Sequence, residues 1–223
     1  MRIRKRKWTD KELSEFKFYI EHGEEYKGKW NEIFEKKQPL HLELGCGKGK
    51  FISKLAAKNP NINYIAVDIV DTMLGLAKRN IEEEYEILNR DIDNVFIVRH
   101  DVERIMLMID EEKDKVDRIY INFCNPWPKS KHKKRRLTYP TQLENYKKFL
   151  KDNGEIYFKT DDDELFNDSL EYFENTDFEI LSKTYDLHSQ NIFEDNIVTE
   201  HEEMFSNEGI KIKALICKKI IKK

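Results

Sequence analysis

Residues 122–137 hold the densest group of side chains that could bind a nucleotide. A mostly apolar strand expected at residues 116–123 leads into Asn-Pro-Trp-Pro at 125–128. Six Lys or Arg residues and one His follow within 129–136. Because proline interrupts both helices and strand pairing, we expect a rigid loop at the C-terminal end of a strand. A flat ring beside a dense cationic run suits a base next to phosphates, whereas a solvated charge run beside a surface Trp is the alternative.

A glycine-rich loop is the second such feature. Residues 43–49 read E-L-G-C-G-K-G and lie between an expected strand and an expected helix. Gly45, Gly47 and Gly49 allow a tight turn and a close approach of the backbone to a ligand, although an ordinary strand–helix turn is the alternative. Glu43 would repel phosphate but suits the cationic amino-acid end of S-adenosylmethionine.

Two more acids follow the next two expected strands. Asp68 comes after the apolar residues 64–67, and Asp101 comes shortly after 95–98. An acid at the end of the second strand usually accepts hydrogen bonds from both ribose hydroxyls, and one after the third could accept from an adenine amino group. Together with Glu43, these acids at matching strand ends predict S-adenosylmethionine as the cofactor.

Strands and helices alternate along the chain. This alternation predicts right-handed βαβ crossovers and a largely parallel sheet of seven strands in an α/β fold. Only a loop is expected between the last two strands, so the last strand should be antiparallel. We expect helices at residues 51–58, 71–88, 103–112, 139–151 and 165–175, and strands at 40–44, 64–67, 95–98, 119–121, 156–158, 178–187 and 210–219.

Basic residues open the chain. Thr9 and Glu12 have capping-box spacing, so a first helix is expected from there to about Glu21. We therefore expect residues 1–30 to form a basic arm and a helix that packs on the core, and residues 31–223 to form a single domain.

Composition narrows the class of protein. The chain has 223 residues, 39% hydrophobic and 37% charged, which is enough for one sizeable core. No apolar stretch of 18 residues exists, so no membrane segment is expected. Three scattered cysteines without a C-x-x-C pair, and histidines without ligand spacing, favour a cytoplasmic protein without a metal. The sequence leaves both a monomer and a homodimer open.

The charge is unevenly distributed. The net charge is only −3, yet eleven of the 40 Lys and Arg residues fall within 2–7 and 129–136, and all 43 Asp and Glu residues lie elsewhere. Two concentrated basic strips on an acidic chain imply local capture of a polyanion.

The order of these motifs resembles the bacterial tRNA (guanine-N(7)-)-methyltransferase family. E-L-G-C-G-K-G, A-V-D-I, H-D-V and N-P-W-P-K-S-K-H-K-K-R-R occur in that order. They are followed by F-K-T-D at residues 158–161, D-L-H at 186–188 and N-I-V-T-E-H-E at 196–202. The resemblance covers essentially the whole chain, and the P-W-P-K-x-x-H-x-K-R-R run is its most specific part.

The resemblance implies a Rossmann-like class I S-adenosylmethionine-dependent methyltransferase fold. It also implies tRNA as the partner, with methyl transfer to guanine N-7 in the variable loop at conventional position 46. The cofactor would be held by Glu43, Asp68, Asp101 and the glycines, with Asn125 between cofactor and base. Substrate contacts are expected from Trp127, Lys129, His132, Lys133, Arg135, Arg136, Asp161, Thr199, Glu200, His201 and Glu202.

Position 125 departs from the family pattern, which usually has Asp-Pro-Trp-Pro. Guanine N-7 has a free lone pair, so methyl transfer needs no general base, but the cationic product favours a nearby carboxylate. We expect Asp161 to supply that charge where Asn125 offers only a dipole. The Asn-Pro-Trp sequence also resembles the Asn-Pro-Pro-aromatic motif of amino-group methyltransferases. That class of enzyme is one alternative, and a catalytically silent RNA-binding methyltransferase fold is another.

Trp127 and Lys129, which follow position 125, each have two interpretations. Lys129 can donate to guanine O6 or to a phosphate, because the Hoogsteen edge of guanine presents only acceptors. Trp127 either stacks on a base or packs under the loop as a structural wedge.

Deletion of residues 2–7 should reduce the salt dependence of tRNA binding. Each phosphate contact that is lost should lower the slope of log affinity against log salt by about 0.7–0.9, because fewer counterions are released. Filter binding over a series of salt concentrations measures this slope. A variant with the parental slope would show that the arm does not contact phosphate, and cofactor affinity serves as the control that should not change.

Overall fold

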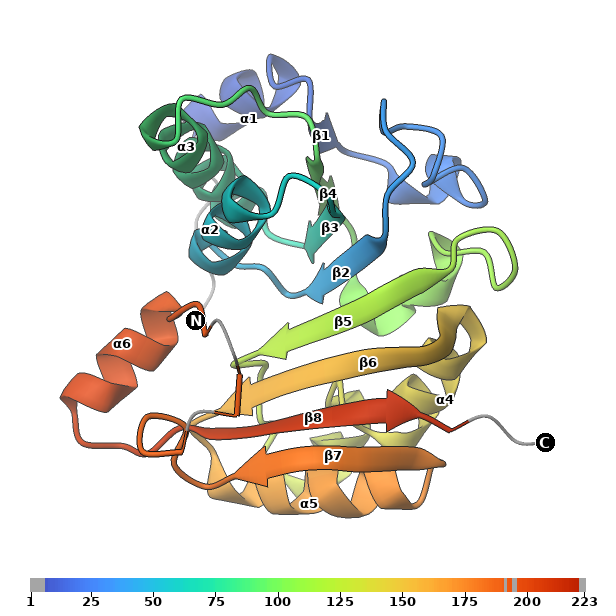
Figure 1. The fold of residues 1–223 in the computed structure, drawn as a ribbon, viewed down its shortest axis with the longest axis vertical. Helices are drawn as coiled ribbons and strands as arrows, with labels where there is room; N and C mark the ends of the chain where they lie inside the picture. Colours follow the sequence, from blue (N-terminus) through green and yellow to red (C-terminus); the bar gives the residue numbers. More distant parts are fainter. Residues whose placement is uncertain (1–6, 191, 194–195, 221–223) are drawn as a thin grey trace. The chain divides into compact units, whose positions relative to one another are not determined.

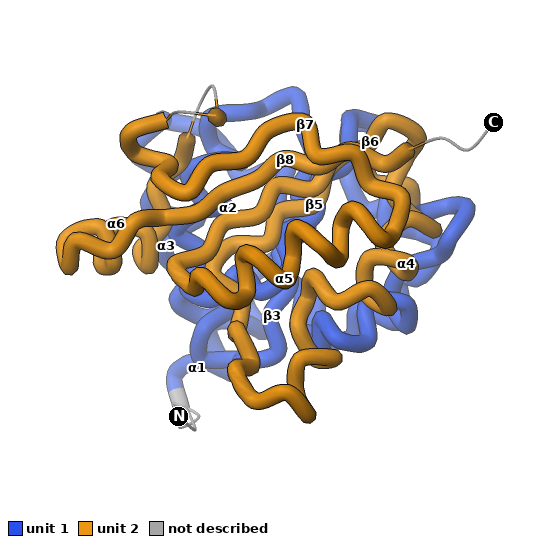
Figure 2. The backbone as a smooth tube through the Cα atoms, turned by 90° about the horizontal axis from the view of Figure 1, so that it is seen from below, with its two compact units in different colours: residues 1–114 blue, residues 115–223 orange. Residues whose placement is uncertain are grey.

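The computed structural model describes residues 7–190, 192–193 and 196–220. The chain forms two compact units, residues 1–114 and 115–223, which have different colours in Figure 2. Each unit has its own strands and buried residues. Residues 2–6 of the predicted basic arm lie outside the described part of the chain.

The sheet of unit 1 is parallel. Its strands have the order β1 (Tyr19–Ile20), β4 (Val95–Arg99), β3 (Asn63–Asp68) and β2 (Leu40–Leu44). All five residues of β2 are buried, and so are the first five of β3, as expected for parallel strands that are covered on both faces. The predicted strands at 40–44, 64–67 and 95–98 are therefore confirmed.

Three α-helices and two short 3-10 segments belong to unit 1. They are α1 (Lys7–Ser14), α2 (Lys50–Lys58), α3 (Asp71–Ile87), η1 (Gly23–Tyr26) and η2 (Val102–Leu107), counted over the described residues only. Helix α1 packs on α3, where Arg79 pairs with Glu12 at 2.6 Å and its guanidinium lies 3.9 Å from the centre of the Trp8 ring. The predictions for α2 and α3 are confirmed.

The first helix differs from its prediction. It ends at Ser14, well before Glu21, and Thr9 lies buried inside it instead of capping it. The reason is that the chain after the helix pairs with β4: Phe18 O accepts a hydrogen bond from Ile97 N at 2.9 Å, and Tyr19–Ile20 become β1.

The predicted helix at 103–112 is also wrong, because only a 3-10 segment, η2, forms there. The buried carboxylate of Asp114 accepts hydrogen bonds from the backbone N–H groups of Asp110 at 2.8 Å, Gly28 at 2.6 Å and Trp30 at 3.1 Å. These bonds draw residues 110–114 toward the segment around residue 28 and out of helical conformation.

The sheet of unit 2 is mixed. Its strands have the order β5 (Val116–Asn122), β6 (Leu150–Thr160), β8 (Lys213–Lys219) and β7 (Phe178–Thr184). Strand β6 is parallel to β5, whereas β8 is antiparallel to both β6 and β7. The predicted antiparallel last strand is confirmed.

Helices α4 (Pro140–Phe149) and α5 (Asp163–Glu174) lie on one side of the unit 2 sheet, as Figure 1 shows. A third α-helix, α6 (Glu200–Asn207), lies where only a loop was predicted between the last two strands. It begins with a capping box in which Thr199 and Glu202 exchange hydrogen bonds, and this local signal was missed because the helix is short and mostly polar. None of the helices described here is long and apolar enough to cross a membrane.

Candidate functional site

The glycine loop of unit 1 has the conformation that its sequence predicts. Gly45, Gly47 and Gly49 have φ angles of 80°, 53° and 70°, in the left-handed region that favours glycine. A Cβ atom at Gly45 or Gly47 would meet nothing within 4 Å, whereas one at Gly49 would lie 2.6 Å from the Cβ of Ala77 on α3. The first two glycines therefore face open space and the third allows α2 and α3 to pack closely.

Asp68 holds this loop at the end of β3. One carboxylate oxygen accepts a hydrogen bond from Gly47 N at 2.9 Å and the other accepts from Val70 N at 2.8 Å. Burial raises the pKa of Asp68, and these backbone bonds oppose that shift. Because a carboxylate offers about four lone-pair positions, Asp68 keeps capacity for ligand hydroxyls.

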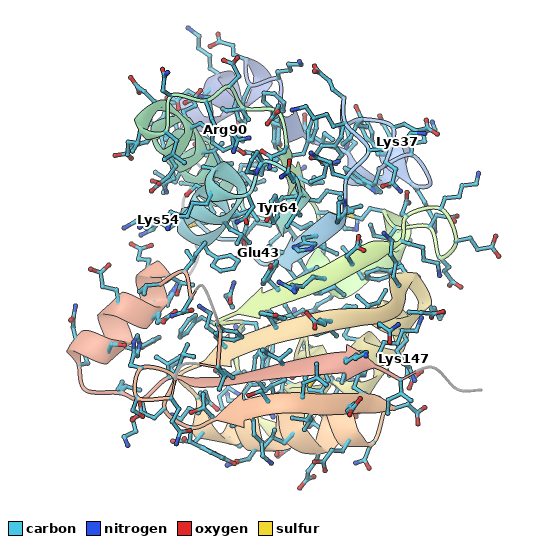
Figure 3. All side chains as sticks on the ribbon, viewed as in Figure 1. Lys37, Glu43, Lys54, Tyr64, Arg90 and Lys147 are labelled. Atoms are coloured by element: carbon cyan, nitrogen blue, oxygen red, sulfur yellow. The ribbon has the colours of Figure 1, made fainter. Side chains whose placement is uncertain are left out.

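The other two predicted acids of unit 1 lie on the same edge of the sheet. Glu43 is buried near the end of β2 and is labelled in Figure 3. Asp101 follows β4, where its carboxylate accepts a hydrogen bond from Glu103 N at 3.0 Å and begins η2. Since β2, β3 and β4 are adjacent and parallel, the structure brings these strand ends together as expected.

The loop after β5 in unit 2 is strained at two aromatic residues. Phe123 and Trp127 have φ angles of 51° and 43°, which residues other than glycine rarely adopt. Phe123 N donates to Lys159 O at 2.9 Å, and the side-chain oxygen of Asn125 accepts from Trp127 N at 3.1 Å. Such strain persists only where the surroundings fix it, as at binding sites.

The basic run after this loop divides into two groups. Arg136 is fully buried, donates to Pro126 O at 2.6 Å and pairs with Asp168 on α5. Lys133 lies 2.6 Å from both Asp168 and Glu164. Acids of α5 therefore hold these two cations within the fold, and their predicted contact with the substrate stays a prediction.

The rest of the run is more accessible. Lys129, Lys131, Lys134 and Arg135 are exposed, and residues 130–135 form the 3-10 segment η3 (Ser130–Arg135). The Arg135 guanidinium lies 3.9 Å from the centre of the half-buried Trp127 ring, and the His132 ring lies 5.8 Å from it. Trp127 thus already has a cation over its ring within the protein.

The predicted substrate residues after β6 fall into an exposed and a buried group. Asp161 is half-buried, and burial raises the pKa of its carboxyl group. Glu200 is half-buried and His201 is exposed in the first turn of α6, and the His201 ring stacks on Phe123 with centroids 5.9 Å apart. Glu202, in contrast, is fully buried and pairs with Lys159 at 2.8 Å.

Sequence reasoning missed Lys159 and Phe123. The signal for Lys159 was available, since it directly follows the apolar strand expected at 156–158, and a lysine that becomes buried needs a partner. Burial raises the pKa of the Cys124 thiol to about 12, which disfavours the thiolate that a cysteine nucleophile needs. Among the described residues, no His, Cys, Asp and Glu group could hold a metal ion.

Comparisons with known proteins place these features in context. Residues 37–215 match the model of a family described as putative methyltransferase. A Clostridium beijerinckii protein named tRNA (guanine-N(7)-)-methyltransferase is 58% identical over 98% of this chain and 99% of its own. A Clostridium perfringens protein of the same name is 54% identical over 99% of this chain and 100% of its own.

Solved structures show the fold. An antibiotic-related methyltransferase has a TM-score of 0.56 at 20% identity, over 82% of this chain and 88% of that one. The 16S rRNA methyltransferase KamB has a TM-score of 0.58 at 13% identity, over 82% and 89%. The predicted methyltransferase fold is thereby confirmed.

Alanine at two glycines of the loop should have different effects. Gly49→Ala should destabilise the protein by about 1–3 kcal/mol, because its Cβ would overlap Ala77. Gly47→Ala should cost about 1–2 kcal/mol of backbone strain, and its methyl group should also obstruct S-adenosylmethionine in the open space. Thermal melting and calorimetric titration measure the two effects. If Gly47→Ala and Gly49→Ala lose the same cofactor affinity at matched stability, Gly47 does not face the cofactor.

The two groups of basic residues should also separate in experiment. Arg136→Ala should destabilise the protein by roughly 2–5 kcal/mol, because it empties the space of a fully buried side chain and removes its bonds to Asp168 and to Pro126 O. Lys131→Ala with Lys134→Ala should leave the melting temperature unchanged and lower the salt slope of tRNA binding by up to about 1.4–1.8. If the double variant keeps the parental slope, the exposed lysines are merely solvated.

Proposed function

Because the chain belongs to the tRNA (guanine-N(7)-)-methyltransferase family, we propose that it methylates N-7 of guanine 46 in the tRNA variable loop, with S-adenosylmethionine as the methyl donor. The observation that carries this proposal is a sequence identity above 50% to proteins of that name along nearly the full chain. The matched stretch includes both the glycine loop and the basic loop, by which we mean residues 123–136. An assignment at this level is specific to the reaction and not only to the fold.

Unit 1 has features that fit S-adenosylmethionine. The open space over Gly45 and Gly47 allows a close approach of the ligand to the backbone. The lone pairs left on Asp68 suit ribose hydroxyls, Asp101 suits the adenine amino group, and the acid Glu43 suits a cationic amino-acid group. When bound, the cofactor would supply an electrophilic methyl group on a sulfonium.

Unit 2 has features that fit the guanine and its RNA. N-7 carries no proton, so the residues of this chain must orient the base and stabilise developing positive charge, and none needs to act as a general base. Asp161 supplies a half-buried carboxylate for that charge. The exposed Lys129 suits O6 or a phosphate, and the stacked Phe123 and His201 rings provide an aromatic surface near Asp161.

The names of the relatives do not favour the amino-group methyltransferase alternative, and Asn125 has a local use in the loop that needs no such chemistry. That chemistry needs the side-chain oxygen of Asn125 to accept from the amino group that is methylated. Here the same oxygen accepts from Trp127 N at 3.1 Å and closes a local turn. Such a turn is a common structural use of Asn.

Nucleoside analysis tests the proposed function directly. The enzyme is incubated with labelled S-adenosylmethionine and a tRNA transcript, and a matched transcript with adenine at position 46 serves as the control. We expect 7-methylguanosine in the first transcript only. A methylated exocyclic nitrogen would establish the amino-group alternative, and cofactor binding without any methylated nucleoside would establish the silent one.

Substitutions at positions 125 and 161 should be coupled. Asn125→Asp should raise the single-turnover rate without tightening tRNA binding, since an added carboxylate stabilises the cationic transition state. Asp161→Ala should be damaging in the natural protein and milder in the Asn125→Asp background. Rates of the four variants measure the coupling, and additive effects would defeat it.

The pH dependence provides a control for this coupling. Burial raises the pKa of Asp161, so its carboxylate should be lost on acidification at a higher pH than that of an exposed Asp, whose pKa is about 3.9. The acid limb of the rate profile should therefore disappear in Asp161→Ala.

A further inference from the structure

Lys159 is a buried cation near the C-terminal end of β6. Only 3% of the residue is exposed. Its ammonium donates to Asn196 Oδ1 at 2.9 Å, Ile197 O at 3.0 Å and Glu202 Oε2 at 2.8 Å. A lysine has three protons to donate, and these partners lie in the first turn of α6 or in the residues just before it.

Glu202 is the buried anion of this pair. Its second oxygen accepts from Asn196 Nδ2 at 2.7 Å, and its side chain completes the capping box with Thr199. His188 Nε2 lies 3.5 Å from the same oxygen. The carboxylate therefore faces the protein interior, although it lies in the stretch that was expected to contact the substrate.

The backbone of Lys159 contacts the loop after β5. Its carbonyl accepts from Phe123 N at 2.9 Å, and the Phe123 ring stacks on His201 at an interplanar angle of 21°. Asp161 follows two residues later, directly after the end of β6. Lys159 thus touches the start of the basic loop through its backbone and the start of α6 through its side chain.

We propose that Lys159 is a positioning residue for the tRNA substrate. It acts through Glu202 to fix residues 196–201 beside Asp161, so that Glu200 and His201 meet the RNA in one arrangement. This inference rests on the proposed function. It assigns Glu202 to holding the segment and leaves the contact with RNA to its neighbours.

Stability alone does not explain a charged pair at this place. Apolar residues of similar volume stabilise a buried site as well as an ion pair does, whereas a pair with several hydrogen bonds specifies one geometry. Here the ammonium also binds two acceptors of the segment, Asn196 Oδ1 and Ile197 O, which an apolar side chain cannot do.

The test uses Lys159→Met, Glu202→Gln, the double variant and Lys219→Met in the full chain. Lys219 is the matched control, because it is a partly buried lysine on β8 that donates to Leu150 O at 2.9 Å and pairs with Asp152 at the start of β6. Glu202→Gln keeps the shape and an acceptor oxygen, and the double variant leaves no unpaired buried charge, so the test remains usable even if Lys159→Met does not fold.

Three measurements are made on each variant. They are the affinity for S-adenosylmethionine by calorimetry, kcat and KM for tRNA, and hydrogen exchange of the amides of residues 196–203 in the free protein. We expect cofactor affinity within about twofold of the parent, a loss of about 10- to 100-fold in kcat/KM for tRNA, and at least about tenfold faster exchange confined to this segment. The double variant should be no worse than the single ones, because the pair acts as one unit.

Different results would overturn the inference. If Glu202→Gln lowers kcat/KM and Lys159→Met does not, or if their effects add, Glu202 contacts the RNA itself. If Lys159→Met behaves like Lys219→Met in kinetics and exchange, the pair is only structural. If the parent enzyme makes no 7-methylguanosine, the proposed function fails, while the exchange data still decide whether Lys159 holds residues 196–203.

Discussion

Charged side chains near the C-terminal end of a buried strand need hydrogen-bond or ion-pair partners. The loops that follow the strands supply these partners, and this requirement fixes the loop conformations. An unpaired buried polar group costs about 1–3 kcal/mol, and a charge costs more. Asp68 meets this requirement with the N–H groups of Gly47 and Val70, which fixes the glycine loop. Lys159 meets it with Glu202, which fixes the entrance to α6. In both units, a side chain that ends a strand determines the adjacent candidate binding surface.

Local patterns explain why unit 1 could be predicted so well near its glycine loop. Strand β2, the three glycines and helix α2 follow one another in sequence, so periodicity and glycine spacing contain nearly all the information. The first helix was predicted less well because its end depends on pairing between Tyr19 and Ile97, which are far apart in sequence. The missing helix at 103–112 depends in the same way on Asp114 and the distant Gly28 and Trp30.

The basic loop shows the limit of reading charge from sequence. A run of cations predicts a polyanion partner, but it does not reveal which members turn inward. Lys133 and Arg136 are three residues apart and both reach Asp168 on α5, so the fold itself neutralises part of the run. Part of the run therefore anchors the loop to α5, and Lys129, Lys131 and Lys134 are the lysines of the run that stay exposed.

Position 125 separates what the fold requires from what the reaction requires. In the fold, this side chain accepts a hydrogen bond from Trp127 N, and Asn and Asp perform that turn function equally well. Loop geometry therefore does not select between them. The two residues differ in charge, and charge matters where a cationic product forms. Position 125 follows β5 and Asp161 follows β6, two adjacent parallel strands in which Asn122 pairs with Lys159. A carboxylate is thus retained at this edge of the sheet, and the Asn changes the number of charges there without changing the loop that carries it.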